Sequence, residues 1–434
     1  MNLKIHRGTH EIGGTCVELG TENTRIIIDL GMPLVDPSGK QFDFREYEEL
    51  DVSELRSQGI LPDIDGLYGQ ADTAVDGVLI SHAHQDHYGL IDFISLDVPF
   101  YAGKATKDLI RLTREFTSGN KVSNNFIHFQ DSEPFRIGDF TVTAFLQDHS
   151  GFDAYGFLIK AEGKTVLYTG DFRKHGRKGS LFKRQKRIIP KNVDYLLLEG
   201  TQIRRIEQET ITEQEIEDKL ISLLQKTSGL VLMYTSGQNI DRLVSLYRAC
   251  LQANRKLVLD FYTASVLKTL SKYNDIPFPS RDYRDLRVYY PPRLTGRMIE
   301  QGLEQYPYQF TSYKISPKDV DRDPAKYVLT VRPSVKNWLD KLHHKRGGIF
   351  IYSLWKGYLT QHYTNKFVTY LEEQGYPMHY LHTSGHADTP TLQEFVSALQ
   401  PQCIIPIHTF HPGEYEHFFD VPVHSLQDGE MLPI

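Results

Sequence analysis

The segment 81–87 (SHAHQDH) constrains this chain most, because it brings three histidines and an aspartate together within six residues. It follows an apolar run typical of a buried β-strand and precedes a helical pattern. Residues two apart in an extended segment point the same way, so His82 and His84 can share one cation while Asp86 and His87 turn to a second. Neutral imidazole and anionic carboxylate both bind zinc, at about 2.0–2.2 Å. The spacing predicts metal binding at a strand end, and the alternative is a polar loop that is merely rich in histidine.

Further candidate ligands follow later β-rich runs, in which His149, Asp171 and His408 each come close to the end of a run. A lone histidine or aspartate in such a place more often caps an element or faces solvent, but the cluster at 82–87 has too few ligands for two ions. We expect His149 to complete the first site, the two oxygens of Asp171 to bridge both ions, and His408 to close the second. Two neighbouring divalent ions activate water and clamp the oxygens of a displacement at phosphorus, which is hydrolysis chemistry.

The length of 434 residues suits two domains, or one domain with a large insert. Short β-rich runs alternate with helical patterns, which predicts an α/β fold. The character of the chain changes near residue 205, and a capping box at Thr212 and Glu215 opens a second α/β unit. The periodicity is poor over 272–345. The expected strands are 23–30, 75–80, 140–146, 164–168, 193–198, 230–234, 256–262, 348–354, 378–382 and 403–407, and the later expected helices are 240–253, 359–374 and 391–399.

The formal net charge of −6 gives the chain no general attraction to nucleic acid. Any polyanion must therefore be held by a local patch or by metal ions. One such patch is the basic stretch 173–191 (RKHGRKGSLFKRQKRIIPK). Composition alone makes it a solvated loop, but it directly follows Asp171, and this position favours a role in gripping phosphates.

No apolar run approaches the roughly 18 residues that a membrane span needs, and the first residues lack the apolar core of a signal peptide. We therefore expect a cytoplasmic protein without membrane contact. The three cysteines, Cys16, Cys250 and Cys403, lack the spacing of a zinc knuckle or redox pair, and we expect them to be buried thiols.

Six motifs carry a family resemblance. HAHQDH (82–87), DHS (148–150) and TGDF (169–172) resemble, in order, the motifs of the metallo-β-lactamase superfamily. LLLEGT (196–201), HTSGHA (382–387) and IPIHTF (405–410) resemble motifs A, B and C of its β-CASP branch, which includes ribonuclease J, the pre-mRNA cleavage endonuclease and the Artemis-like DNA nucleases. The resemblance implies an α/β fold, with an αββα catalytic domain interrupted by an inserted α/β domain and a substrate cleft between them. On this chain it places the first catalytic part at 1–205, the β-CASP domain at 206–377 and the return segment at 378–434.

The resemblance also implies roles for single residues. Glu199 matches the acidic residue of motif A, His386 the histidine of motif B and His408 the histidine of motif C. A carboxylate near His386 would hold its tautomer and raise its pKa, which suits a general acid. Histidine in motif C is associated with RNA substrates in this family, and valine with DNA. We therefore expect catalysis by Asp86, Glu199 and His386 on single-stranded RNA, with two divalent ions, zinc or manganese, held by His82, His84, Asp86, His87, His149, Asp171 and His408.

Substrate contacts are predicted at five positions. Arg173 and Lys174 begin the basic stretch, Ser236 follows a strand in the segment TSGQ, and Ser384 and Gly385 belong to motif B. Serine and glycine clusters also make ordinary turns. The chain ends soon after motif C, so we expect it to lack the additional C-terminal domain of typical ribonuclease J, and a homodimer is left open as its assembly.

Three other functions stay open. A DNA nuclease of the same branch is opposed by His408 alone. A small-molecule thioesterase or lactonase shares the H-x-H-x-D-H core but not the large insert or motifs A to C. An inactive RNA-binding subunit would predict missing ligands, and every expected ligand is present. Cleavage within a strand and cleavage from the 5′ end are equally compatible with the motifs.

Overall fold

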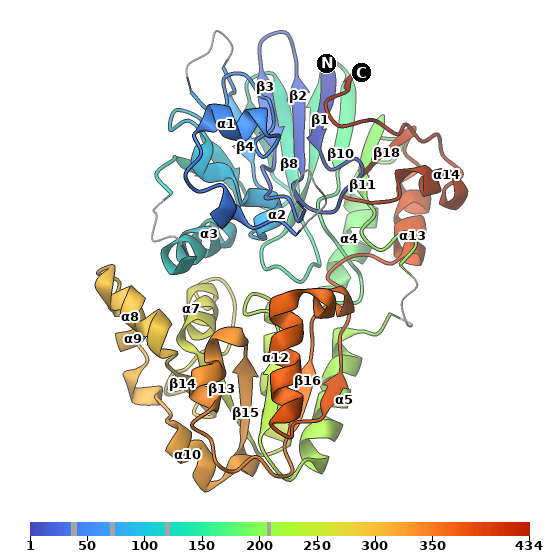
Figure 1. Ribbon diagram of the computed structural model, residues 1–434. Helices are drawn as coiled ribbons and strands as arrows, with labels where there is room; N and C mark the ends of the chain where they lie inside the picture. The colour runs from blue at the N-terminus through green and yellow to red at the C-terminus, as the bar shows by residue number, and fades with distance from the viewer. Residues whose placement is uncertain (36–40, 70–73, 118–121, 206–209) are drawn as a thin grey trace.

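The computed structural model in Figure 1 describes residues 1–35, 41–69, 74–117, 122–205 and 210–434. The predicted start of the inserted domain, at 206, lies outside these ranges. The described residues form three β-sheets. Two of them pack together in the upper part of Figure 1, and the third forms the lower part.

The first sheet has the strand order β19-β1-β2-β3-β4-β5-β6. Its strands are β1 (Asn2–Arg7), β2 (Cys16–Gly20), β3 (Arg25–Ile28), β4 (Gly77–Leu79), β5 (Phe100–Ala102), β6 (Phe126–His128) and β19 (Met431–Pro433). The antiparallel pairing of β1 with β19 brings the two chain ends side by side (Figure 1).

The second sheet has the order β18-β11-β10-β9-β8-β7. Its strands are β7 (Pro134–Ile137), β8 (Phe140–Leu146), β9 (Tyr155–Ala161), β10 (Lys164–Tyr168), β11 (Tyr195–Glu199) and β18 (Cys403–Ile407). β18 comes from the end of the chain and pairs in parallel with β11, so a segment far along the sequence completes this sheet.

Alternation along the strands creates four layers. In β3, Ile26 and Ile28 join the core between the two sheets, whereas Ile27 faces the helices on the outer side. That outer layer contains α1 (Val52–Ser57), α2 (Gln85–Tyr88) and α3 (Lys104–Thr117). On the far side, Leu196 and Leu198 of β11 pack against α4 (Ser180–Ile188), α13 (Thr389–Leu399) and α14 (Tyr415–Phe418). The predicted αββα sandwich is therefore confirmed (Figure 1).

The third sheet is entirely parallel and has the order β14-β13-β15-β12-β16-β17. Its strands are β12 (Val231–Tyr234), β13 (Lys256–Asp260), β14 (Leu286–Tyr289), β15 (Tyr327–Val331), β16 (Ile349–Tyr352) and β17 (Met378–Tyr380). Helices α5 (Glu213–Lys226), α6 (Ile240–Gln252) and α7 (Phe261–Leu270) cover one face, and α11 (Lys336–Leu339) and α12 (His362–Glu373) cover the other. The carboxyl ends of the strands point toward the αββα part (Figure 1).

Two predicted boundaries differ from the structure. The strand expected over 256–262 ends at Asp260, because this side chain accepts a hydrogen bond from the backbone N–H of Thr263 (3.0 Å) and so caps α7. β17, expected to begin the return segment at 378, pairs with β16 and belongs to the third sheet. We propose that the return to the αββα domain begins after Tyr380.

The stretch without clear periodicity, 272–345, contains short elements. Besides β14, β15 and α11 it holds α8 (Pro292–Glu300), α9 (Gln305–Tyr308) and α10 (Pro317–Arg322). Helices this short carry few turns, so an apolar stripe is hard to recognise in the sequence. None of the helices in the described ranges combines the length and the apolar composition of a membrane span.

Candidate metal centre

Three histidine nitrogens meet at the carboxyl end of β4. His84 Nδ1 lies 3.0 Å from His82 Nε2 and 3.1 Å from His149 Nε2, and the rings of His82 and His149 are fully buried. His149 donates its Nδ1 proton to the backbone carbonyl of Gly385 (2.6 Å), which leaves the lone pair of Nε2 for a ligand. Burial lowers the pKa of His82 and His149 well below the usual range, so both rings are neutral, the form that binds metal.

A second group joins one turn of α2 to two later strand ends. Ligand atoms of Asp86, His87, Asp171 and His408 all lie within 4.8 Å of one another. His87 Nε2 is 3.1 Å from Asp171 Oδ2, and His408 Nε2 is 3.5 Å from Asp86 Oδ2. Asp171 Oδ2 also lies 3.7 Å from His82 Nε2. The carboxylate of Asp171 is therefore placed between the two groups.

Asp29, at the end of β3, supports both groups and was not identified from the sequence. Its carboxylate accepts hydrogen bonds from His87 Nδ1, the Tyr168 hydroxyl, and the backbone N–H and hydroxyl of Ser81, all at 2.8 Å. Its φ of 60° is the left-handed conformation that non-glycine residues rarely adopt, and such residues gather at functional sites. A polar residue ending the buried run RIII was the only signal in the sequence.

His386 and Glu199 form a third group beside the second. His386 Nδ1 lies 3.3 Å from Glu199 Oε2 and 3.7 Å from Asp171 Oδ2. Glu199 is itself fixed, since it accepts hydrogen bonds from the backbone N–H of Phe172 (3.2 Å) and of Thr201 (3.2 Å). Burial opposes a charge on His386, but the carboxylates of Glu199 and Asp171 outweigh it and raise its pKa above the usual range.

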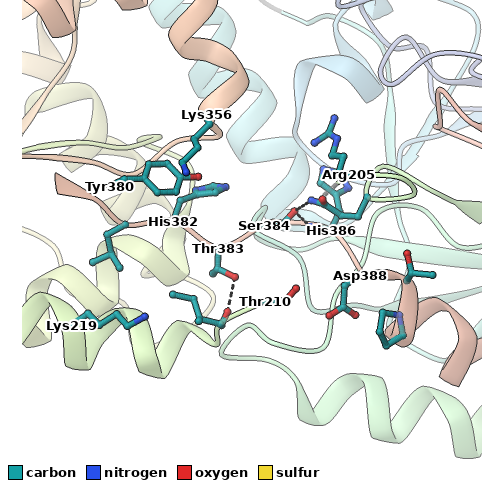
Figure 2. A pocket seen from close by; sticks show the side chains of 15 residues that line it. Arg205, Thr210, Lys219, Lys356, Tyr380, His382, Thr383, Ser384, His386 and Asp388 are labelled. Atoms are coloured by element: carbon teal, nitrogen blue, oxygen red, sulfur yellow. Dashed lines mark hydrogen bonds between the residues drawn. The ribbon is translucent and has the colours of Figure 1, made fainter. Parts of the chain in front are cut away.

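A cavity of about 740 Å³ opens beside His386, between the two parts of the molecule. Figure 2 shows Ser384 and His386 on one side, with Lys356, Tyr380 and Lys219 on the other. Lys356 Nζ lies 4.4 Å from the centre of the Tyr380 ring. The cavity is lined by Gln202, Arg205, Thr210, Ile211, Lys219, Lys356, Tyr380, Leu381, His382, Thr383, Ser384, His386, Asp388, Thr389 and Pro390.

Comparison with known families gives two matches. Residues 52–227 match the Beta-lactamase superfamily domain, and residues 377–417 match the Zn-dependent metallo-hydrolase RNA specificity domain. The second match covers motifs B and C, including His408, and the first covers the other candidate ligands of the two groups. The chain belongs to the β-CASP branch of the metallo-β-lactamase superfamily.

Relatives of this β-CASP protein include ribonuclease J from Helicobacter pylori, 24% identical over 429 residues, which span 94% of this chain and 55% of the relative. Ribonuclease J from Sinorhizobium meliloti is 25% identical over 86% of this chain and 65% of its own length. The match thus spans 55% and 65% of the length of these two relatives. A crystal structure of a protein of unknown function from Enterococcus faecalis shares the fold, with a TM-score of 0.77, 22% identity and 99% of both chains covered.

The residues of the β-CASP protein fit divalent metal ions. His87 Nδ1 lies 2.8 Å from Asp29 and Nε2 lies 3.1 Å from the Asp171 oxygen, so a proton or a metal ion fits between Nε2 and that oxygen. Asp171 Oδ1 and His408 Nε2 are buried and have no hydrogen-bond partner among the described residues. A cation satisfies all of these atoms, which a purely structural cluster would leave unpaired.

Arg173 does not lie where a phosphate contact was predicted. Its side chain is fully buried, and its guanidinium donates to Asp241 Oδ2 (2.6 Å) and to the Ser384 carbonyl (2.9 Å). The same group lies 3.4 Å from Asp148 and 3.6 Å from Glu213. The prediction for Arg173 is wrong, because its donors join the αββα domain to the β-CASP domain and none faces solvent.

Several other cations of the basic stretch are also paired. Lys174 and Lys186 both contact Glu394 of α13, and Arg184 pairs with Asp131. These contacts hold α4 against its neighbours, and Lys174 is not among the residues that line the cavity. These paired residues therefore support the domain rather than forming a free cationic loop.

The remaining predicted substrate residues separate into two places. Ser384 lines the cavity, and the carbonyl of the adjacent Gly385 holds His149. Ser236 is exposed in the loop after β12, where its hydroxyl accepts a hydrogen bond from the backbone N–H of Gln238 (3.2 Å), and it does not line this cavity. A substrate contact at Ser384 stays a prediction.

Proposed function

We propose that this protein is a two-metal phosphodiesterase of the cytoplasm that cleaves single-stranded RNA. The observation that carries the proposal is that the carboxylate of Asp171 lies between the two ligand groups. Directly beside them is a cavity lined by three cationic side chains, Arg205, Lys219 and Lys356. Support for RNA comes from the match of 377–417 to an RNA specificity domain and from relatives named ribonuclease J.

The first ion would be held by His82, His84 and His149, and the second by Asp86, His87, Asp171 and His408. Histidine and carboxylate ligands suit zinc, with manganese as the alternative. When bound, a pair of such ions lowers the pKa of water and neutralises charge on a phosphodiester. The second-sphere contacts of Asp29 and Gly385 fix the tautomers of His87 and His149, so these rings present lone pairs to the ions.

His386 is the proposed proton donor to the leaving oxygen. Its Nδ1 faces Glu199 at 3.3 Å, so Glu199 orients the ring and favours its protonated form. The Nε2 atom is then the proton carrier available to a substrate in the cavity. Glu199 acts through His386, because both its oxygens already accept backbone hydrogen bonds.

The cavity supplies the other requirements of a single strand. Lys219 and Lys356 offer charge for phosphates, and the half-buried Tyr380 ring beside Lys356 offers a surface on which a base can stack. Ser384 accepts a hydrogen bond from the backbone N–H of His386 (3.1 Å), and its hydroxyl lies at the boundary between the metal centre and this surface. These groups recognise backbone and base faces, not a sequence.

The proposal is tested by incubating the purified protein, with zinc or manganese, with end-labelled single-stranded RNA and DNA of the same sequence. An Asp86→Ala His87→Ala variant should lose cleavage, and a His343→Ala His344→Ala variant, which changes two adjacent exposed histidines, should keep it. The product ladder separates internal cleavage from removal of 5′ nucleotides.

Selective cutting of DNA would replace RNA by the alternative substrate. Inactivity on both, with two ions bound per chain, would reject phosphodiester cleavage in favour of a small-molecule hydrolase or an RNA-binding subunit. The homodimer stays a prediction, which sedimentation of the purified chain measures.

A further inference from the structure

A second cavity, of about 390 Å³, lies between α3 of the αββα domain and the β-CASP domain. Its lining residues are Phe116, Thr117, Tyr262, Arg293, Leu294, Arg297, Arg332 and Ser334. None of them belongs to the metal centre or lines the cavity beside His386. The function proposed above leaves this second cavity without a role.

Its position is one where α/β sheets bind ligands. Tyr262 follows the carboxyl end of β13, and Arg332 follows that of the neighbouring strand β15. A Cβ atom at Gly237, in the loop after β12, would lie 3.4 Å from both Tyr262 and Arg332, so this loop closes the back of the same region. In open parallel sheets, the crevice beyond the carboxyl ends of the strands is the usual binding site.

Three guanidinium groups line the cavity, and no carboxylate is among the described residues that line it. Arg332 is held by Asp260 and by the Thr263 hydroxyl, and Arg297 donates to the Phe116 carbonyl. Arg293 has no hydrogen bond or ion pair with any residue in the described part of the chain, and it lies one helical turn from Arg297. A guanidinium that has no partner among the described residues, beside two that are held, is suited to a phosphate, which accepts two parallel N–H donors.

Aromatic and apolar surface lies next to this charge. The Tyr262 and Phe116 rings meet edge to face, with centroids 5.0 Å apart, and Arg332 lies 5.5 Å from the centre of the Tyr262 ring. The Tyr262 hydroxyl accepts a hydrogen bond from Gln238 Nε2 (2.7 Å), which fixes the ring, and Leu294 adds aliphatic surface. Such a wall favours a flat heteroaromatic ring over a sugar or a bare anion.

We propose that this cavity binds one nucleotide, with its phosphate on Arg293 and Arg297 and its base against Tyr262. The volume is at the small end of the range for ligand sites and accommodates a single nucleotide unit. The same chemistry is presented by a free nucleoside monophosphate and by one residue of a longer RNA strand. Binding of an RNA strand here rests on the proposed ribonuclease function, whereas binding of a free nucleotide does not.

The test uses the metal-loaded full chain in three forms: wild type, Arg293→Ala, and Arg248→Ala as a matched control. Arg248 is an exposed arginine of α6 in the same domain and does not line the cavity. Calorimetric titration with adenosine 5′-monophosphate measures the free nucleotide, and KM for a labelled single-stranded RNA measures the strand. Loss of one charge-assisted phosphate contact should weaken binding by about tenfold.

A weaker titration only in Arg293→Ala supports a free nucleotide as the occupant. A KM raised about tenfold at unchanged kcat, again only in Arg293→Ala, supports a residue of the strand. If Arg293→Ala matches Arg248→Ala in both measurements, the proposal is overturned. If the wild type cleaves no RNA, the proposed function fails, while the titration still decides whether the cavity binds a nucleotide.

Discussion

Replacing Arg173 with methionine removes one positive charge from a buried group of carboxylates. The guanidinium lies 2.6 Å from Asp241, 3.4 Å from Asp148 and 3.6 Å from Glu213, and the arginine side chain is fully buried. Removing one partner of a buried ion pair leaves uncompensated charge and costs about 3–5 kcal/mol. The Ser384 carbonyl would lose a donor as well.

Lys174 is the matched control, because it is the next residue, carries the same charge and also forms an ion pair. Its partner Glu394 is 40% exposed and its own side chain is 38% exposed, so water replaces the contact and Lys174→Met should cost no more than about 1 kcal/mol. The two variants should therefore differ by about 2–4 kcal/mol in the free energy of unfolding.

Urea unfolding at pH 7, followed by both fluorescence and circular dichroism, gives these free energies where the two transitions coincide. Should Arg173→Met fail to fold, Arg173→Lys keeps the charge but not the forked donors, and an intermediate loss is expected. A loss below about 1 kcal/mol for Arg173→Met, equal to that of Lys174→Met, would refute the view that this residue neutralises buried carboxylates.

Three further predictions concern the metal centre and its surroundings. A Cβ atom at Gly31 would lie 1.7 Å from the Asp86 carbonyl, so Gly31→Ala should cost about 3 kcal/mol or more in urea unfolding, while Gly413→Ala, with open space around it, should stay within about 0.5 kcal/mol. Asp171→Asn should lower the bound metal, measured by mass spectrometry after dialysis, from about two ions per chain to one or fewer, and two retained ions would contradict the bridging role. Burial lowers the pKa of His175 to about 4, so the unfolded chain takes up this proton below pH 6.5 before the folded chain does. Stability should then fall by up to about 3 kcal/mol from pH 6.5 to pH 4, and by less in His175→Gln; an equal fall in both would exclude His175 as the cause.

The sequence identified those candidate ligands whose signal is local, and the fold brings them together. His82, His84, Asp86 and His87 are within six residues, and the later ligands each follow a strand pattern, so the strand-end rule was enough to group them. Three strands of the second sheet, β8, β10 and β18, were placed to the residue because their apolar runs end abruptly in polar segments.

The basic stretch was misread because its partners are distant in the sequence. Arg173 pairs with Asp241 across 68 positions, and Lys174 with Glu394 across 220. Composition shows the charge of a segment, but only the folded chain brings the opposing carboxylates to it. Arg293 and Arg297, in contrast, were not identified as site residues from the sequence. They lie in a region of poor periodicity, and nothing in the sequence indicates that they share a cavity with Tyr262.

The hydrogen bond from His149 to Gly385 joins residues separated by 236 positions, and His408 comes later still. A ribosome adds residues from the N-terminus at about 5–20 per second, so the three-histidine group is synthesised well before the β-CASP domain and the return strand. Until residue 408 has emerged, the ligand group that contains Asp86 and His87 lacks its last member, and β18 has not joined the second sheet. The order of synthesis thus delays completion of the centre until the whole β-CASP domain has been synthesised and β18 has emerged.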